Sequence, residues 1–397
     1  MTRTLTLASA LAILSVSGAT ACGSSDSGGG TAAATGGSGN GGAGDGGAAN
    51  AGSGNGGAGN GSSGGGASSG GTGSGSGGSG NGDGGTPGTT GTRLAPTSVF
   101  YQDISGAAVD SESKMILDAL QASAWGDPGK RQTLGVDFSF EINVADPSVP
   151  RRAFTQDPGA LPDCDTAPIP LVPGGKTEGA DDYACSGGDC HLLVFQGTRL
   201  YELYQADVTG GMATGGDFTG SCLVVWDLTK DYWAPKDPPD FSRGDGCNGA
   251  DAGDMPIAPL LLTSEELAAG EVKHALRFTI SNNRIRSDVY VHPATHIGGP
   301  SGGPDTLPYG SRLRLRADYD LASLPNDAAR TVAKALQKYG MFLADGGNIY
   351  VSATTSASDQ IGGSDLGDLQ PSDFEMIEGG ARINWHDQNC TRTPVSD

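Results

Sequence analysis

The amino-acid sequence predicts a mainly β fold: an antiparallel β-sandwich or barrel with a few peripheral helices. Three observations lead to this prediction. Several segments alternate apolar and polar residues with the period of two that is typical of a half-buried strand. Segments with the helical period are few, and strands and helices do not alternate along the chain as they do in parallel-sheet proteins. All of these segments lie within residues 93–397 of the 397-residue chain.

Two segments carry the clearest strand pattern. Residues 136–144 (VDFSFEINV) alternate strictly, so we expect one face to be buried and the other to be wet. Residues 312–317 (RLRLRA) alternate as well, which places Leu313, Leu315 and Ala317 on the buried face. Further strands are expected at residues 191–196, 222–226, 275–280, 288–291 and 348–353.

Three segments carry helix signals. Asn326 is a favourable N-cap for a run whose apolar residues share one stripe and which ends before Gly340. Ser372 with Glu375 resembles a capping box and predicts a short helix there. Asp110 is expected to open a third helix.

The N-terminus follows the pattern of an export signal. Arg3 gives a positive start, residues 5–16 (LTLASALAILSV) form an apolar run of the length found in signal peptides, and small residues precede Cys22. The run is shorter than the roughly 20 apolar residues that a membrane-spanning helix needs. We therefore expect residues 1–21 to be a cleaved signal peptide.

The residues around the expected cleavage site suggest lipidation. The stretch 19–22 (ATAC) resembles the bacterial lipobox, with Ala in place of the usual Leu at its first position. The resemblance implies a lipid-modified Cys22, and several acyl chains at ~0.8 kcal/mol per buried CH₂ form a durable anchor. Gly23 after Cys22 implies, by analogy with Gram-negative sorting, the outer membrane or cell surface. Plain secretion with an unmodified Cys22 is the alternative.

Between this anchor and the strand-rich part lies a segment of low complexity. This segment, residues 22–92, begins with Cys22. The residues after Cys22 are almost all Gly, Ser, Ala, Asn and Thr, which cannot build a core. We expect a disordered tether with a root-mean-square span of about 45–50 Å. Residues 93–397 then form a single extracytoplasmic β-rich domain.

Charge and cysteine content constrain the partners and the compartment. The net charge of −21 argues against nucleic acid as a partner, and it limits membrane contact to the lipid anchor. Besides Cys22 the chain has six cysteines, an even number that predicts three disulfides in an oxidising compartment. Fifteen pairings are possible, and the sequence does not choose among them.

Common catalytic and metal-binding motifs are absent. The sequence has no P-loop, no G-x-S-x-G elbow and no H-E-x-x-H, and it leaves any cofactor unknown. His292 and His296 flank Pro293, and a third ligand for a catalytic zinc is not evident, so structural roles are favoured. Residues 345–348 (DGGN) are interpreted as a tight turn and not as a calcium site. The sequence therefore predicts no metal site.

One candidate site comes from the geometry of a hairpin. Residues 189–195 and 200–206 are joined by a segment in which Gly197 suits a two-residue turn of type II′. In that register Leu193 pairs with Glu202, and Asp189, His191 and Glu202 share one face of the hairpin. A carboxylate beside an imidazole brings either pKa into a useful range. The alternative is a solvated face with an incidental histidine.

A second group of candidate residues lies between positions 251 and 296. Asp251 precedes a stiff apolar segment, and His274 begins a strand in which Arg277 faces the side opposite to its apolar neighbours. His292 follows the next expected strand.

Several short segments stand out, among them 189–191 (DCH), 274–279 (HALRFT) and 290–296 (YVHPATH). Together with several others, they resemble a family of secreted bacterial proteins. The resemblance covers most of residues 180–350, and the members of this family are often joined to carbohydrate-binding modules. It implies a glycan partner, and no catalytic residue is carried over from it. The segments are 189–191 (DCH), 200–202 (LYE), 250–253 (ADAG) with 256–257 (PI), 274–279 (HALRFT), 290–296 (YVHPATH), 339–341 (YGM) and 344–345 (AD).

These observations support two main functional hypotheses. The first is a surface-anchored enzyme, a glycoside hydrolase or polysaccharide lyase, that cleaves extracellular polysaccharide with an acidic pair. The second is a non-catalytic lipoprotein that binds a glycan or a protein, and a purely structural envelope protein is a third. In the first hypothesis the catalytic residues are Glu202, Asp251, His191 and His274, and the substrate-binding residues are Asp189, Trp226, Arg277 and His292.

Overall fold

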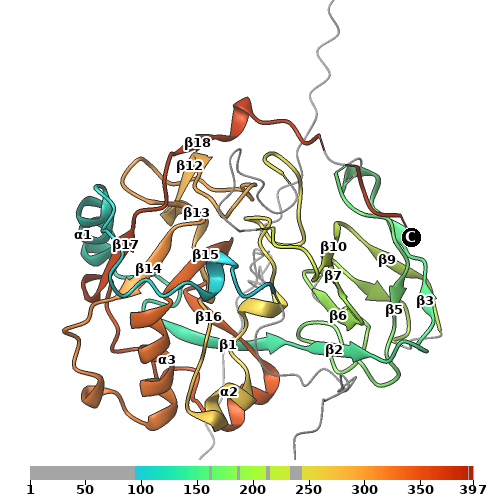
Figure 1. Cartoon of the computed structure of the whole chain (residues 1–397), viewed down its shortest axis with the longest axis horizontal. Helices are drawn as coiled ribbons and strands as arrows, with labels where there is room; N and C mark the ends of the chain where they lie inside the picture. The colour runs from blue at the N-terminus through green and yellow to red at the C-terminus, as the bar shows by residue number, and fades with distance from the viewer. Residues whose placement is uncertain are drawn as a thin grey trace, which may run out of the picture. The chain divides into compact units, whose positions relative to one another are not determined.

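The computed structural model describes residues 94–160, 163–185, 188–211, 215–232, 244–391 and 393–396. The expected signal peptide, Cys22 and the tether lie outside these residues. Within them the chain is mostly β, with several sheets and few helices, which confirms the predicted class (Figure 1). Of the thirteen strand pairings recorded for this part of the chain, eight are antiparallel and five are parallel. The parallel pairs were not expected from the sequence.

The largest sheet has six strands and mixed direction. It has the order β1-β16-β11-β15-β14-β17, and its strands come from both ends of the described chain. The central strand β11 pairs in parallel with β15 and antiparallel with β16. The six strands are β1 (Gly135–Phe140), β16 (Tyr350–Thr354), β11 (Leu276–Ile280), β15 (Met341–Gly346), β14 (Arg312–Leu315) and β17 (Phe374–Ile377).

A four-stranded sheet follows the first strand of the large sheet directly along the chain. Its order is β10-β7-β6-β2, and a single residue separates the end of β1 from the start of β2 (Figure 1). Alternate residues on its strands enter two different cores: Leu193 and Phe195 join the core shared with the six-stranded sheet, and Leu192 and Val194 join a smaller one. This sheet is therefore buried on both faces. Its strands are β10 (Leu223–Asp227), β7 (Arg199–Leu203), β6 (Leu192–Gln196) and β2 (Ile142–Ala145).

The remaining sheets are small. The orders are β13-β12-β18, β3-β5 and β4-β9-β8. Their strands are β13 (Leu307–Tyr309), β12 (Ile285–Tyr290), β18 (Ile383–Asn384), β3 (Arg151–Arg152), β5 (Ile169–Pro170), β4 (Thr155–Gln156), β9 (Phe218–Gly220) and β8 (Asp207–Val208).

Two of the three expected helices are present. Asn326 caps α3 (Asp327–Lys338) by accepting a hydrogen bond from the backbone N–H of Ala329, as expected. The helix α1 (Ser113–Ser123) buries Ile116 and Leu120. A further helix, α2 (Ser264–Ala269), begins with a capping box formed by Thr263 and Glu266. Short 3₁₀ segments lie at Val99–Tyr101, Pro158–Ala160, Ala258–Leu260, Asn282–Arg284, Leu321–Ser323, Thr355–Asp359, Pro371–Asp373 and Trp385–Asp387.

The prediction of a helix at Ser372 is wrong. Residues Pro371–Asp373 form one 3₁₀ turn, and β17 begins at the next residue. Asp373 closes the cap by accepting from the backbone N–H of Gln370 at 2.8 Å. Glu375 is thereby left to pair across the sheet with Arg314, at 2.7 Å.

The strand at 312–317 differs from its prediction in one respect. Leu313 and Leu315 are buried as expected, but the strand ends at Leu315 and Ala317 is exposed. Arg312 and Arg314, expected on a wet face, are also buried because residues 99–107 cover them and accept their hydrogen bonds through backbone carbonyls.

The hairpin of β6 and β7 has the predicted register. Leu193 lies opposite Glu202, and Gly197 at the turn has φ +60°, which a type II′ turn requires. His191 lies against the ring of Tyr204, with 5.2 Å between ring centroids. His191 and Glu202 therefore share the face that meets the larger core.

All six cysteines of the described part form disulfides, which confirms the expected number. The pairs are Cys164–Cys222, Cys185–Cys190 and Cys247–Cys390. In the ranges described above, no helix has the length and apolar content that crossing a membrane would require.

Candidate functional site

Two irregularities in the six-stranded sheet lie close to its polar centre. Pairing with β16 skips a residue of β1 between Asp137 and Phe140, and pairing with β11 skips a residue of β15 between Leu343 and Asp345. Such bulges redirect side chains and are frequent next to active sites. Both interruptions fall at residues whose side chains enter one group of ionisable residues.

We call this group the Arg277 cluster. Its members come from the six-stranded sheet, from the start of the β6–β7 hairpin and from two loops. They are linked by hydrogen bonds, by ion pairs or by the electrostatic influence of one charge on another. The members are Asp137, Ser139, Glu178, Asp189, His191, Asp251, Arg277, Asp345 and Ser352.

Arg277 lies at the centre of the cluster. Its Nη2 donates to Asp251 Oδ1 at 2.7 Å and to Asp345 Oδ2 at 3.0 Å, and its Nη1 donates to Ser352 Oγ at 2.7 Å. The guanidinium also lies 5.3 Å from the ring centre of Phe140. The side chains of Arg277 and Asp251 are 2% and 0% exposed, so neither charge is compensated by water. Asp345 is the more accessible of the two carboxyls, with a side chain that is 12% exposed.

The two carboxyls that share Arg277 are not equivalent. Burial, together with the neighbouring carboxylate of Asp251, raises the pKa of Asp345 to about 8, although Arg277 acts in the opposite direction. Burial would lower the pKa of Arg277, but Asp251 and Asp345 outweigh it and raise the pKa above its usual range. Burial and Asp251 thus favour the protonated form of Asp345 at neutral pH, against Arg277 and the backbone N–H of Gly346, beside a guanidinium that stays charged.

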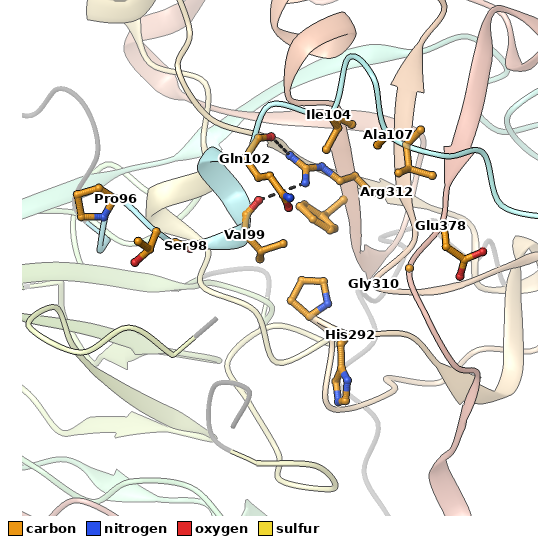
Figure 2. Close-up of a pocket in the computed structure, with 15 residues that line it drawn as sticks. Pro96, Ser98, Val99, Gln102, Ile104, Ala107, His292, Gly310, Arg312 and Glu378 are labelled. Atoms are coloured by element: carbon orange, nitrogen blue, oxygen red, sulfur yellow. Dashed lines mark hydrogen bonds between the residues drawn. The ribbon is translucent and has the colours of Figure 1, made fainter. Parts of the chain in front are cut away.

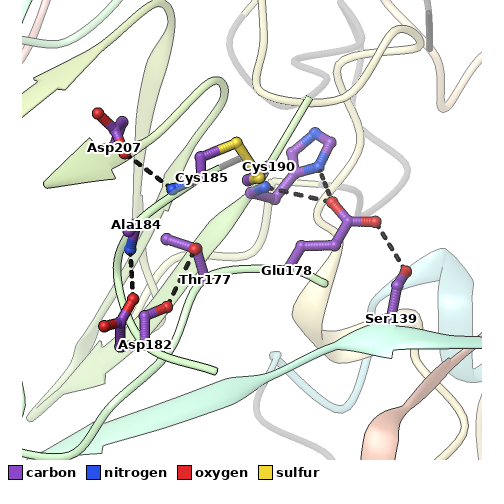
Figure 3. Close-up of a disulfide and its surroundings, with 9 residues drawn as sticks. Ser139, Thr177, Glu178, Asp182, Ala184, Cys185, Cys190 and Asp207 are labelled. Atoms are coloured by element: carbon purple, nitrogen blue, oxygen red, sulfur yellow. Dashed lines mark hydrogen bonds and ion pairs between the residues drawn. A yellow bond between two sulfur atoms is a disulfide. The ribbon is translucent and has the colours of Figure 1, made fainter. Parts of the chain in front are cut away.

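A second ion pair extends the cluster to the hairpin. Glu178 Oε2 lies 2.5 Å from His191 Nδ1, and Glu178 Oε1 accepts from the hydroxyl of Ser139 at 2.9 Å (Figure 3). His191 Nε2 lies 2.9 Å from the carbonyl oxygen of Ala250. Since both ring nitrogens face acceptors, the doubly protonated imidazolium satisfies both.

The pKa values of this pair follow from its geometry. Burial would lower the pKa of His191, but the carboxylate of Glu178 outweighs it and the pKa rises to about 9. Burial would raise the pKa of Glu178, but His191 outweighs it and the pKa falls below its usual range. Glu178, with a side chain that is 16% exposed, is thus an ionised carboxylate that water can reach.

Two further carboxyls at the rim are harder to ionise. Burial and the charge of Glu178 raise the pKa of Asp137, against the hydrogen bonds from Ser139. Burial raises the pKa of Asp189, against the charge of His191 and a hydrogen bond that the hydroxyl of Tyr204 donates. The cluster thus brings together carboxyls whose pKa values are shifted in opposite directions, which is the arrangement that supplies an acid and a base.

Glu202 touches the cluster only through the charge of Asp251, has its own set of hydrogen bonds, and has no exposed surface, so we treat it apart from the cluster. Its Oε1 accepts from the backbone N–H groups of Ile257 and Ala258 at 2.9 and 2.8 Å, and its Oε2 accepts from Trp226 Nε1 at 2.7 Å. Burial raises the pKa of Glu202 to about 7, against these three hydrogen bonds. The carboxyl therefore joins β7, β10 and the loop before Ala258.

The structure brings four of the eight predicted site residues together. Asp189, His191, Asp251 and Arg277 belong to the Arg277 cluster. Trp226 is a core residue, 1% exposed, in edge contact with Tyr232 and bonded to Glu202.

His274 belongs to a different network. Its Nε2 lies 2.8 Å from Glu266 Oε1, and its Nδ1 lies 2.8 Å from the carbonyl oxygen of Ala275. Glu266 also closes the capping box of α2. His274 thus connects the first turn of α2 to the start of β11.

His292 lines a pocket with a volume of about 520 Å³ (Figure 2). Its Nε2 lies 2.8 Å from Asp245 Oδ1, which also accepts from the hydroxyl of Tyr290 at 2.6 Å. The pocket lies on the same face of the sheet as the Arg277 cluster, because Arg312, Phe342 and Arg277 occupy facing positions on β14, β15 and β11.

Sequence reasoning missed five members of the cluster. Asp137 and Ser139 were assigned to the wet face of a strand, and Asp345 was assigned to a turn, whereas it lies in β15. A polar residue at every second position of a strand was the available signal for the first two. Glu178 and Ser352 carried no signal in the sequence.

Among the residues that the structure describes, no three His, Cys, Asp or Glu side chains are arranged to hold a metal ion. The acids of the cluster have Arg277 and His191 as their cations.

Fold and site together define a mainly β, disulfide-linked protein with a partly exposed acid–base cluster beside a pocket. Comparison with models of protein families, with curated proteins and with solved structures finds no match.

Proposed function

We propose that this chain is a lipid-anchored surface protein that acts on extracellular polysaccharide, and that it cleaves glycosidic bonds at the Arg277 cluster. The anchor is the lipid on Cys22, with the tether of residues 22–92 between it and the domain. The observation that carries the proposal is one buried network in which the side chains of Asp345 and Glu178 keep 12% and 16% of their surface exposed, with the pKa of Asp345 raised by burial and Asp251 and that of Glu178 lowered by His191.

The proposal gives each residue a role. Asp345 donates the proton to the leaving oxygen, because burial and the nearby carboxylate of Asp251 raise the pKa of Asp345. Glu178 is the ionised partner, and His191 and Ser139 orient it. The reaction needs one carboxyl of each kind. Glu202 and Asp251, the pair expected from the sequence, are fully covered, so the proposal assigns the contact with substrate to Asp345 and Glu178.

A panel of neutral and acidic polysaccharides tests this proposal. Product release is measured by reducing ends and by the absorbance of unsaturated sugars, which separates hydrolysis from elimination. Asp345→Asn keeps the size and the acceptor for Arg277 but removes the acid, so turnover should fall by about 10²-fold or more. Asp359→Asn, at an exposed position, is the matched control and should keep full turnover. Equal turnover in wild type and Asp345→Asn would contradict the proposal.

A second candidate function is a non-catalytic glycan-binding lipoprotein. The hydrogen bonds that cover Glu202 and Asp251 favour it over catalysis by that acidic pair, because neither carboxyl is exposed to a substrate. Binding of a polysaccharide without any product would support this function.

A further inference from the structure

The pocket in Figure 2 has one buried cation in otherwise mostly apolar walls. Arg312 is 6% exposed and lies beside Val99, Ile104, Phe342 and Ile377. Its Nε donates to the carbonyl oxygen of Tyr339 at 2.7 Å, and its two terminal nitrogens donate to those of Val99 and Gln102 at 3.2 and 2.9 Å. Phe342 lies under the guanidinium, 4.9 Å from ring centre to Cζ.

These contacts leave part of the guanidinium unused. An arginine has five N–H groups, and three are used here, so each terminal nitrogen keeps one N–H without an acceptor among the described residues. A carboxylate that binds arginine in a bidentate pair accepts two N–H hydrogen bonds, so the two remaining N–H groups match one carboxylate in number.

The charge of Arg312 is also poorly compensated. Among the described residues no carboxylate lies within 4.0 Å of it, and all three of its acceptors are neutral carbonyls. Burial accordingly lowers the pKa of Arg312 below its usual range, against a weaker influence of Asp103. A buried cation without an anion is costly, and an anionic ligand in the pocket would offset that cost.

The acids near the pocket do not take this role. Glu378 lines the pocket, but its carboxylate accepts from the backbone N–H of Gly380 and is turned away from Arg312 (Figure 2). Asp245 is engaged by Tyr290 and His292, and the ring of His292 points away from Arg312 in the same view.

We propose that this pocket binds a sugar that bears a carboxylate, a hexuronate, with Arg312 as the residue that holds the carboxylate. The volume of about 520 Å³ accommodates one or two sugar rings. That the ligand is a sugar rests on the proposed function, whereas the carboxylate site follows from Arg312 alone.

Calorimetric titration of the purified mature protein with sodium glucuronate tests the inference, with glucose as the uncharged match at equal ionic strength. Glucuronate should bind at least about tenfold more tightly than glucose, and Arg312→Gln should remove that difference. Arg316→Gln is the control, because Arg316 is half-exposed and does not line the pocket. Asp345→Asn should keep glucuronate binding even where turnover is lost, so a failure of this site and a failure of the catalytic proposal are distinguishable.

Arg312 also joins three backbone segments, and Arg312→Gln has to be checked for folding. Ala107→Phe is the second variant: it fills the pocket and leaves intact the Ala107 carbonyl, which accepts from Arg314. It should weaken glucuronate binding at least about tenfold. Glucuronate that binds no better than glucose, or binds equally to a folded Arg312→Gln variant, would overturn the inference.

Discussion

Replacing Glu202 by Gln should change how the stability of the protein depends on pH. The carboxyl has no exposed surface, and burial raises its pKa to about 7 from an ordinary value of 4.5. Between these two values the unfolded state loses the proton while the folded state keeps it, so stability falls as pH rises. The full shift corresponds to about 3 kcal/mol, and about 2–3 kcal/mol of it lies between pH 5 and 8.

The measurement is the free energy of unfolding in urea at pH 5, 6, 7 and 8 for wild type and Glu202→Gln. At pH 5 the variant should be less stable by about 1–3 kcal/mol, because its amide nitrogen faces the indole N–H of Trp226. That deficit should shrink by about 2–3 kcal/mol toward pH 8, since only wild type has a carboxyl to ionise there. Glu271→Gln, at an exposed position, is the control and should follow wild type at every pH. A deficit that stays constant from pH 5 to 8 would refute the reasoning.

Three further predictions concern stability. Arg277→Met should cost about 3–5 kcal/mol, because it leaves the buried charge of Asp251 without its partner; a loss under 1 kcal/mol in urea unfolding would contradict this. Replacing both cysteines of Cys247–Cys390 by Ser should lower the free energy of unfolding by about 5 kcal/mol, and the same change at Cys185–Cys190 should lower it by about 2 kcal/mol. The difference arises because the first disulfide closes a loop of 143 residues and the second a loop of 5. Equal costs in urea unfolding would disprove the loop-length argument. Asn326→Ala should cost about 1–2 kcal/mol through loss of the cap on α3 and of the hydrogen bond that the Asn326 amide donates to Asp365, whereas Asn326→Ser, which keeps an acceptor for the N–H of Ala329, should cost less; the two melting temperatures decide.

Features governed by local sequence could be predicted. The register of the β6–β7 hairpin follows from Gly197 at the turn, and the start of α3 follows from Asn326 as N-cap. The even number of cysteines predicted three disulfides, but their pairing depends on which loops meet in the fold.

Features that depend on distant segments could not be predicted. The pairing of β1 with β16 joins Asp137 to Ser352, more than 200 positions apart, and no local pattern carries that information. Arg312 and Arg314 alternate with leucines and so indicate a wet face, yet the backbone of residues 99–107 covers them. A bulge changes the face to which a side chain points, as at Asp345, so a strict alternation of period two does not predict that side chain's position.

The candidate site was predicted in part for the same reason. His191 and Asp189 were assigned to the site from the register of the β6–β7 hairpin, which the local sequence determines. Glu178 and Asp345 entered it through contacts between segments far apart in the chain. Glu202 is fully buried because the backbone of residues 257 and 258 contacts its carboxyl. The alternation of polar and apolar residues in β7 does not predict that contact.

The central claim is that Asp345 is protonated at neutral pH while Glu178 is ionised. Carbon-13 NMR of the side-chain carboxyls, titrated from pH 4 to 10 in wild type, Asp345→Asn and Glu178→Gln, measures both states directly. We predict one carboxyl that titrates near pH 8 and is missing in Asp345→Asn, and another that titrates below the usual glutamate range and is missing in Glu178→Gln. An Asp345 carboxyl that is already ionised at pH 6 would contradict the account.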